Sequence, residues 1–387
     1  MKSSTERILT THVGSLPRPD DLFEMMLARM DGMAVDEKAY TARLDAAVKD
    51  CVRQQREAGL DIVSDGEMGK PSFITYAASR LSGLKKREGF RPSPFANTRE
   101  TRDFPEYYQS TVAEQVSARR RRALMVCAGP IKYIGNAALK ADLDRLKAAL
   151  ANVKAAEAFV PAIAPSNVES TTPNEYYPTP EAYVVAIAEA MREEYRAIVD
   201  AGFLLQIDDP FLVTYYITRP DLDIAACRKW AELRVEALNT ALAGIPADRI
   251  RFHTCYSINM GPRINDMQLK DIVDIIVKVR AGAYSFEAAN PRHEHEWEDW
   301  QRIKIPDDKI LIPGAITQST VLVEHPELVA QRLTRFATAV GRERVIAGAD
   351  CGFASFAGSN EVHPSIVWAK FKALVDGARL ASARLWK

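Results

Sequence analysis

The sequence contains few of the residues that bind metals or form disulfides. Only five cysteines and six histidines occur among 387 residues. An odd number of cysteines without any short spacing excludes the disulfide framework of a small secreted domain. Taken one at a time, a cysteine in such a chain is best interpreted as a small buried residue. The five are Cys51, Cys127, Cys227, Cys255 and Cys351.

The chain also lacks an excess of charge and a long apolar run. Lys+Arg and Asp+Glu both total 51, so no net field draws the protein to nucleic acid or to an anionic membrane. The opening stretch "MKSSTERILTTHVGS" has no apolar signal core, and no window approaches the length of a membrane span. We therefore expect a cytoplasmic protein with small-molecule partners and neither a nucleic-acid nor a membrane partner.

Short apolar runs alternate with amphipathic helical patterns along most of the chain. The helical patterns at 179–202 and 325–341 each end at a glycine, as helices commonly do. Eight strand–helix units in this order predict one (β/α)8 TIM barrel over residues 1–387. An open doubly wound sheet is the alternative, but no GxGxxG follows the first strand. The predicted strands are 60–65, 122–129, 158–166, 202–209, 249–255, 283–288, 309–314 and 344–350.

Two segments fall outside this count of strands. Residues 1–59 form a leading segment, with "THVGSLPRP" as an extended or looped entry followed by a helix. Residues 84–121 are polar, basic and aromatic-bearing, and we interpret them as an insertion after the first strand. This insertion is either a lid, an arm that joins a homo-oligomer, or a solvated surface loop.

The ends of the predicted strands carry the residues that favour a metal site. Barrel enzymes place their sites at these C-terminal ends. His253 and Cys255 lie two residues apart at one strand end and therefore point to the same side. Glu287 and Cys351 end two later strands, and singly they are explained by an ion pair and by packing in a Gly-rich turn. Together, one imidazole, two thiolates and a carboxylate favour tetrahedral Zn²⁺ over Mg²⁺ or Ca²⁺.

A zinc site with one exchangeable carboxylate suggests that the metal activates a substrate thiol. If Glu287 gave way to a substrate thiol, the cation would deprotonate that thiol and hold a nucleophilic thiolate near neutral pH. This is the chemistry of alkyl transfer to sulfur. Glu67 and Asp208, at other strand ends, are then candidates for binding the ammonium group of an amino-acid thiol. The alternative is that these acids cap helices or pair with Lys70 and Arg263.

Six motifs resemble one known family. "THVGSLPRP", "SDGEMGK", "LLQIDDP", "HTCYSIN", "FEAANPRHEHEW" and "AGADCGF" resemble, in the same order, the zinc-binding catalytic half of cobalamin-independent methionine synthase. The resemblance runs from about residue 8 to about residue 370 and implies a barrel of the methionine synthase/uroporphyrinogen decarboxylase type. It implies that Ser15, Glu67 and Asp208 contact the homocysteine backbone and that zinc activates the thiol for methylation to methionine. The zinc ligands that it implies are His253, Cys255, Glu287 and Cys351.

The chain departs from the family pattern where a methyl donor would bind. Asp209 replaces the glutamate of "IDEP", and "CAGPIKYIGN" offers Tyr133 and Asn136 where the family carries a tryptophan suited to stacking a folate ring. The family's histidine near the seventh strand is absent from "ILIPGAITQST". The donor therefore stays open between methyltetrahydrofolate and a methylcorrinoid, and so does the need for a second protein that presents the corrinoid.

Other parts of the pattern support different functions. "EAANPRHEHEW" and "DCGF" are similar to a shorter branch that includes epoxyalkane:coenzyme M transferase, in which a zinc thiolate opens an epoxide. His293 and His295 are candidate acid/base groups beside the site, together with Asp209, although the histidines are also explained as a surface pair. A third interpretation is a zinc-stabilised barrel that binds partners without catalysis.

Overall fold

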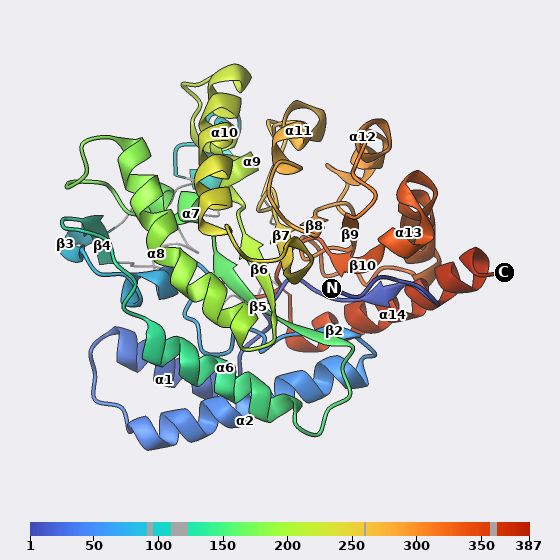
Figure 1. The fold of residues 1–387 in the computed structure, drawn as a ribbon, viewed down its shortest axis with the longest axis horizontal. Coiled ribbons are helices and arrows are strands. Elements are labelled where there is room, and N and C mark those ends of the chain that lie inside the picture. The colour runs from blue at the N-terminus through green and yellow to red at the C-terminus, as the bar shows by residue number, and fades with distance from the viewer. Residues whose placement is uncertain (91–95, 110–122, 259–260, 357–361) are drawn as a thin grey trace.

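A parallel sheet of eight strands forms the centre of the molecule and curls into a nearly closed barrel with helices on its outside (Figure 1). The computed structural model describes residues 1–90, 96–109, 123–258, 261–356 and 362–387. The neighbours in the barrel run in the order β1-β10-β9-β8-β7-β6-β5-β2. This confirms the predicted (β/α)8 architecture. The barrel strands are β1 (Leu9–Thr10), β2 (Ile62–Val63), β5 (Glu157–Ile163), β6 (Leu204–Asp208), β7 (Ile250–His253), β8 (Ala283–Phe286), β9 (Ile310–Ile316) and β10 (Ile346–Ala349).

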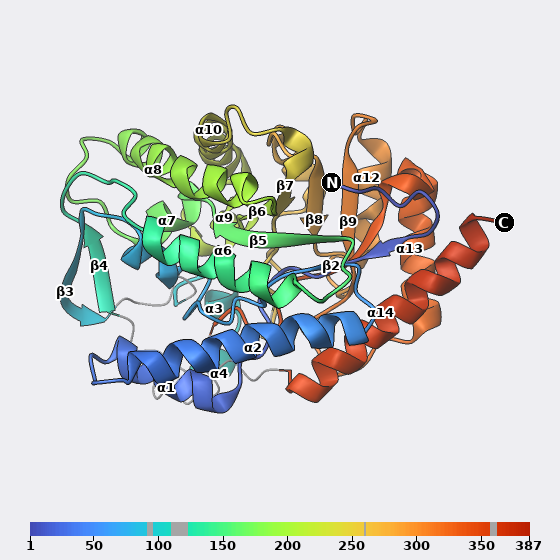
Figure 2. The ribbon, with the colours of Figure 1, turned by 60° about the horizontal axis from the view of Figure 1, so that its bottom comes forward.

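The helices that connect successive strands cover the outside of the barrel (Figures 1 and 2). The longer ones bury a face that is mostly apolar, as expected for amphipathic helices in a βα barrel. Eight of them follow the eight strands in turn: α2 (Glu37–Glu57), α6 (Asn136–Leu150), α8 (Pro180–Asp200), α10 (Ile224–Ala241), α11 (Val273–Ile276), α12 (Trp297–Arg302), α13 (Pro326–Val340) and α14 (Pro364–Leu385). The remaining helices precede α2 or lie in loops: α1 (Asp20–Met30), α3 (Arg99–Asp103), α4 (Pro105–Tyr107), α7 (Pro165–Thr171) and α9 (Phe211–Thr218). None of the helices in the described ranges combines the length and the apolar character needed to cross a membrane.

Short polar contacts close the barrel between β1 and β2, the two ends of the strand order. The backbone N–H of Asp61 donates to the Thr10 carbonyl at 3.0 Å. The Thr11 hydroxyl donates to the Ile62 carbonyl at 3.2 Å. Inside the barrel, the buried Arg251 donates to the hydroxyl of Thr11 at 3.0 Å and lies 4.0 Å from the ring centroid of Phe159. The interior is therefore filled by side chains, as in other barrels of eight strands.

One predicted barrel strand is wrong. Residues 122–129 were expected as the second strand, but β4 (Ala123–Cys127) pairs antiparallel with β3 (Leu84–Phe90) in a separate ribbon. This ribbon stands away from the barrel, at the left of Figure 2. The first barrel strand is instead β1, in the segment that was expected to be a looped entry. The prediction from periodicity was wrong here for two reasons. β1 is only two residues long, and the sequence of β4 is an apolar run that looks the same as that of a buried barrel strand.

The insertion accordingly follows the second barrel strand, β2, and not the first. Residues 91–95 and 110–122 lie outside the described residues. In the described part, the backbone N–H of Asn265 donates to the buried Glu100 at 3.0 Å, and Arg99 donates to the carbonyl of Tyr216 at 3.1 Å. This part is thus packed on loops of the barrel. The packing argues against the interpretation of the insertion as a freely solvated loop. Its roles as a lid or an oligomer arm stay predictions.

His12 is buried in the core next to the end of β1. Its ring lies 5.3 Å from the ring of Phe159 and 5.6 Å from that of Phe371, measured between centroids. Nε2 contacts Gln55 Oε1 at 2.7 Å, and Nδ1 accepts from the Gly14 N–H at 3.2 Å, which assigns the proton to Nε2. Burial lowers the pKa of His12 to about 3, opposed by the Gln55 contact and reinforced by Arg251. The imidazole is therefore neutral in the folded protein.

This neutral histidine makes stability depend on pH in the acid range. The folded pKa lies below the unfolded value of about 6.5, so below that pH the unfolded chain binds a proton that the folded chain does not. The free energy of unfolding should fall by about 2 kcal/mol between pH 7.5 and pH 5 through this group alone. Urea unfolding at both pH values, with a chelator present, should show this extra loss in the wild type but not in His12→Gln. Equal losses in the two proteins would contradict the assignment.

Candidate metal centre

Three predicted metal ligands meet at the C-terminal mouth of the barrel. His253 ends β7, Cys255 follows it by two residues, and Cys351 follows the end of β10 by two residues. Their ligand atoms all lie within 4.8 Å of one another, and the two sulfur atoms are 3.3 Å apart. A flat sheet would separate β7 from β10 by two intervening strands, so the closure of the barrel is what brings these side chains together.

The chemistry of this trio fits a bound cation. His253 Nδ1 contacts Ser285 Oγ at 3.3 Å, while the buried Nε2 has no hydrogen-bond partner among the described residues. Such an atom is costly to bury unless something else satisfies it. Burial, with a smaller contribution from Arg251, lowers the pKa of His253 to about 3, which leaves the ring neutral with a lone pair to offer. Both cysteines are free thiols.

The Cys255 thiol needs a nearby cation to ionise. The hydrogen bond with Cys351, followed by burial, raises the pKa of Cys255 well above its usual range. Without a positive charge nearby, this thiol is therefore protonated. A divalent metal would bind the thiolate form and release the proton.

Glu287, the fourth predicted ligand, is not part of this cluster in the structure. Its Oε2 accepts from the side-chain amide of Asn290 at 2.8 Å, and its Oε1 accepts a long bond of 3.4 Å from the Ile258 N–H. Burial, and then the charges of Cys255 and Asp350, raise the pKa of Glu287. Metal binding by Glu287 stays a prediction.

Asp350 ties together the loops that carry the candidate ligands. One carboxylate oxygen accepts from the backbone N–H groups of Ala288 and Ala289 at 2.7 and 2.8 Å. The other accepts from Asn290 at 3.1 Å. Because Asp350 directly precedes Cys351, these bonds position the cysteine relative to the loop that follows β8.

A small cavity of about 30 Å³ lies beside the cluster. Three residues predicted to bind substrate, Ser15, Glu67 and Asp208, line it together with His253 and the two clustered cysteines. The structure thus brings to one place two groups that lie far apart in the sequence. The other lining residues are Val13, Phe73, Pro210, Gly352 and Ser355.

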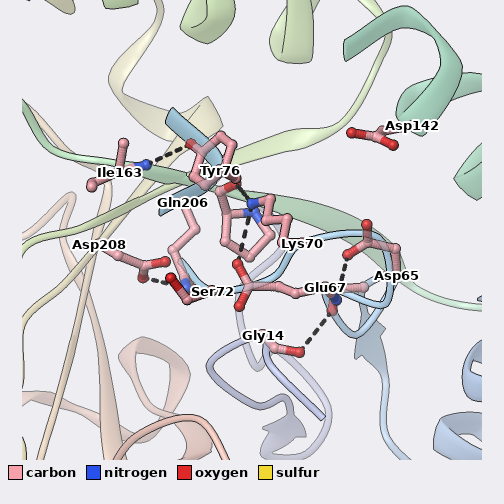
Figure 3. A network of polar contacts seen from close by, with 12 residues as sticks. Gly14, Asp65, Glu67, Lys70, Ser72, Tyr76, Asp142, Ile163, Gln206 and Asp208 are labelled. Atoms are coloured by element: carbon pink, nitrogen blue, oxygen red, sulfur yellow. Dashed lines mark hydrogen bonds and ion pairs between the residues drawn. The ribbon is translucent and has the colours of Figure 1, made fainter. Parts of the chain in front are cut away.

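The two acids of the cavity have different partners (Figure 3). Glu67 pairs with Lys70 at 3.1 Å and has a φ of 56°, a left-handed conformation rare outside glycine. Asp208 accepts from the amide of Gln206 at 2.7 Å. Burial, and then the charge of Glu67, raise the pKa of Asp208 well above its usual range. The predicted alternative for Glu67, an ion pair with Lys70, is therefore present in the structure.

The comparison with protein families decides the identity of this barrel. A model described as "Cobalamin-independent synthase, Catalytic domain" matches residues 8–158 and 162–372. The chain belongs to this family. Its relatives include methionine synthases of Thermococcus kodakarensis, 26% identical over 344 residues, and of Pyrococcus furiosus, 25% identical over 346 residues. The first match covers 89% of this chain and 86% of the relative, and the second 89% and 85%.

A solved structure supports the fold of this cobalamin-independent synthase domain. The B12-independent methionine synthase from Shewanella sp. W3-18-1, in complex with selenomethionine, matches with a TM-score of 0.71. The match covers 98% of this chain and 99% of the other at 19% sequence identity. At that identity the likeness concerns the architecture alone.

None of the three candidate acid/base groups is among the residues that line the cavity of this family member. The Asp209 carboxylate accepts from the Leu212 N–H at 3.1 Å in the first turn of α9. His295 is exposed. His293 is buried, stacks on Tyr256 at 3.7 Å between centroids, and contacts Glu296 at 3.0 Å.

The surroundings of His293 keep it protonated. Burial lowers the pKa of His293, but contacts with Asp266 and Glu296 outweigh burial and raise the pKa to about 10. A histidine that holds its proton across the neutral range is a structural cation. A role in acid/base catalysis for these three residues stays a prediction.

Sequence reasoning missed several lining residues of the synthase domain. Gly352 packs so closely that a Cβ there would lie 2.0 Å from Ser15 Oγ, and Ser355 follows Cys351 by four residues. Both lie beyond Cys351 in the loop after β10, further from the strand end than the residues that a reading of strand ends includes. The "DCGF" motif was the available signal for Gly352. Tyr133, considered for a folate site, instead donates to Glu194 at 2.7 Å and is buried.

Proposed function

We propose that this protein is a zinc-dependent methyltransferase that methylates the thiol of homocysteine to give methionine. The observation that carries the proposal is the convergence of His253, Cys255 and Cys351 on a cavity that Glu67 and Asp208 also line. Membership of the cobalamin-independent synthase family and the names of the relatives support the same activity.

The chain's own residues would hold the metal and orient its ligands. His253, Cys255 and Cys351 would be the fixed ligands, with Ser285 orienting the imidazole through its contact with Nδ1. Glu287 would be the exchangeable ligand, with Asn290 holding its carboxylate whenever it is displaced. Zn²⁺ bound there would lower the pKa of the substrate thiol and so supply a thiolate at neutral pH.

The acids of the cavity would bind the amino-acid end of the substrate. Glu67 and Asp208 are buried acceptors for an ammonium group, and Ser15 offers a hydroxyl to the same end. Charge-assisted hydrogen bonds in such a site are strong because water is excluded. A cavity of about 30 Å³ has room for about one water molecule, so the lining loops must move when the thiol enters.

The coenzyme M alternative finds less support in this geometry. A sulfonate needs a cationic partner. Among the described residues that line the cavity there is neither lysine nor arginine, whereas two carboxylates are present. Turnover of epoxypropane with coenzyme M would nevertheless overturn the preference for homocysteine. An assay with homocysteine as the acceptor and a panel of donors that includes methyltetrahydrofolate and methylcobalamin would identify the methyl donor.

The proposal predicts that a thiol enters the metal shell. X-ray absorption at the zinc edge should show two sulfur neighbours in the loaded protein and three after homocysteine is added, because the substrate sulfur replaces a lighter ligand. Methionine, which has no thiol, is the matched control and should leave the shell unchanged. A non-catalytic, zinc-stabilised barrel predicts the same shell with and without homocysteine, so an unchanged spectrum would count against the enzyme.

A further inference from the structure

Lys70 is a buried cation next to the cavity. Its side chain is 8% exposed, and its ammonium lies 3.1 Å from Glu67 Oε1. The same nitrogen donates to the Pro161 carbonyl of β5 at 2.6 Å and lies 4.4 Å from the ring centroid of Tyr76 (Figure 3). A carboxylate, a carbonyl and an aromatic face thus surround the ammonium, which has three protons to share.

The groups around Lys70 are themselves fixed by hydrogen bonds. The Tyr76 hydroxyl donates to Glu194 at 2.8 Å and accepts from the Ile163 N–H at 3.0 Å. The buried Arg18 donates to the carbonyls of Glu67 and Lys70, both at 2.8 Å. The position of the ammonium is therefore determined by the barrel wall and by the turn after β2. Of the groups around the ammonium, Glu67 is therefore the one that Lys70 can position.

Only one oxygen of the Glu67 carboxylate is used by this pair. Oε1 contacts Lys70, while Oε2 has no hydrogen bond to any described residue, although Glu67 lines the cavity and is 2% exposed. Asp208, the second acid, receives its hydrogen bond from Gln206 and none from Lys70. Lys70 thus fixes one acid of the two and leaves an acceptor atom free for a ligand.

We propose that Lys70 is a positioning residue for Glu67, and that the pair makes the site selective for thiols that carry an ammonium group. The inference rests on the proposed function, since it concerns the thiol that the site accepts. Lys70 neither touches the reacting sulfur nor lines the cavity. A purely structural ion pair would support all thiols equally, whereas a positioned acceptor favours only those with an ammonium.

The test compares homocysteine with 4-mercaptobutyrate, which lacks only the amino group. Titration calorimetry on the zinc-loaded, full-length wild type should show that homocysteine binds about 10- to 100-fold more tightly, the range of a hydrogen-bonded charge pair. Lys70→Met should reduce this preference to less than about threefold by weakening homocysteine alone, with the dissociation constant of 4-mercaptobutyrate changed less than about twofold.

Two further variants sharpen the comparison. In a Glu67→Gln background, Lys70→Met should change the preference no further, because the acceptor it positions is gone. Lys372→Met is the matched control: this lysine of α14 is 76% exposed, pairs with Asp376 at 3.6 Å, and should leave the preference at the wild-type value. If Lys70→Met does not fold, Lys70→Gln takes its place with the same expectation.

The outcomes separate this inference from the proposed function. An unchanged preference in the Lys70 variants, or an equal loss of affinity for both thiols, overturns the positioning role and leaves the proposed function intact. A zinc-loaded wild type that binds neither thiol overturns both.

Discussion

Replacement of Cys255 or Cys351 by alanine is expected to remove zinc retention and methyl transfer together. A structural zinc site is worth about 10–16 kcal/mol over four ligands, so one lost ligand should weaken binding by about 100- to 1000-fold. The remaining thiol cannot compensate, because it already occupies its own position in the same site, 3.3 Å from the position of the sulfur that is removed. Zinc stoichiometry after dialysis against a competing chelator, measured with activity on the same samples, checks this.

Cys227→Ala is the matched control for both cysteine variants. Cys227 is a buried free thiol on α10, outside the cluster, so its replacement removes the same atoms from a packed interior without touching the metal. It should retain zinc and activity. Full zinc stoichiometry in both Cys255→Ala and Cys351→Ala would refute the assignment of the ligands.

Gly314→Ala is expected to destabilise the barrel and to release the metal. A Cβ at Gly314 on β9 would lie 2.0 Å from Asp350 Oδ1, 2.7 Å from Asp350 N and 2.8 Å from its Cα. The backbone cannot withdraw easily, because the Asp350 N–H donates to the Ile316 carbonyl at 2.9 Å. We expect a loss of about 3 kcal/mol in the free energy of unfolding, typical of severe overpacking. Zinc affinity should fall too, since Asp350 positions Cys351.

Urea unfolding midpoints and zinc affinity together check this variant. Gly129→Ala is the control, because the nearest heavy atom to its added Cβ is 3.5 Å away, an ordinary contact distance. It should leave both quantities near their wild-type values. A Gly314→Ala protein with the wild-type midpoint would show that β9 and β10 can separate without penalty.

The strands were predictable to different degrees for a physical reason. The runs at β5, β9 and β10 are largely apolar because both faces of these strands are buried, and such runs stand out in a sequence. β1 is two residues long, so its pairing depends on partners elsewhere and not on a local pattern, whereas the equally short β2 lies within the predicted run 60–65. β4 has the apolar character of a barrel strand, yet pairs with the polar β3. Register and partner choice are decided by the whole fold.

The positions of the candidate ligands followed from a simple rule, and this rule has a limit. His253, Cys255 and Cys351 were found by reading residues at the ends of parallel strands, which must meet at one mouth of a barrel. The same rule named Glu287, which accepts a hydrogen bond from the amide of Asn290 and is not part of the three-residue cluster. His293 came from the "PRHEHE" motif instead, and its two carboxylate neighbours hold its proton. Neither the amide partner of Glu287 nor the carboxylate partners of His293 can be predicted from the residues at strand ends.

The order of the motifs and the apolar runs determined by themselves that this chain forms a (β/α)8 barrel of the cobalamin-independent synthase family, because both are local properties of the sequence. Tertiary structure alone decided which strand begins the barrel, where the insertion packs and which of two acids receives the ammonium of Lys70. Those features depend on contacts between residues distant in the chain, whose distances and burial are set only when the barrel closes.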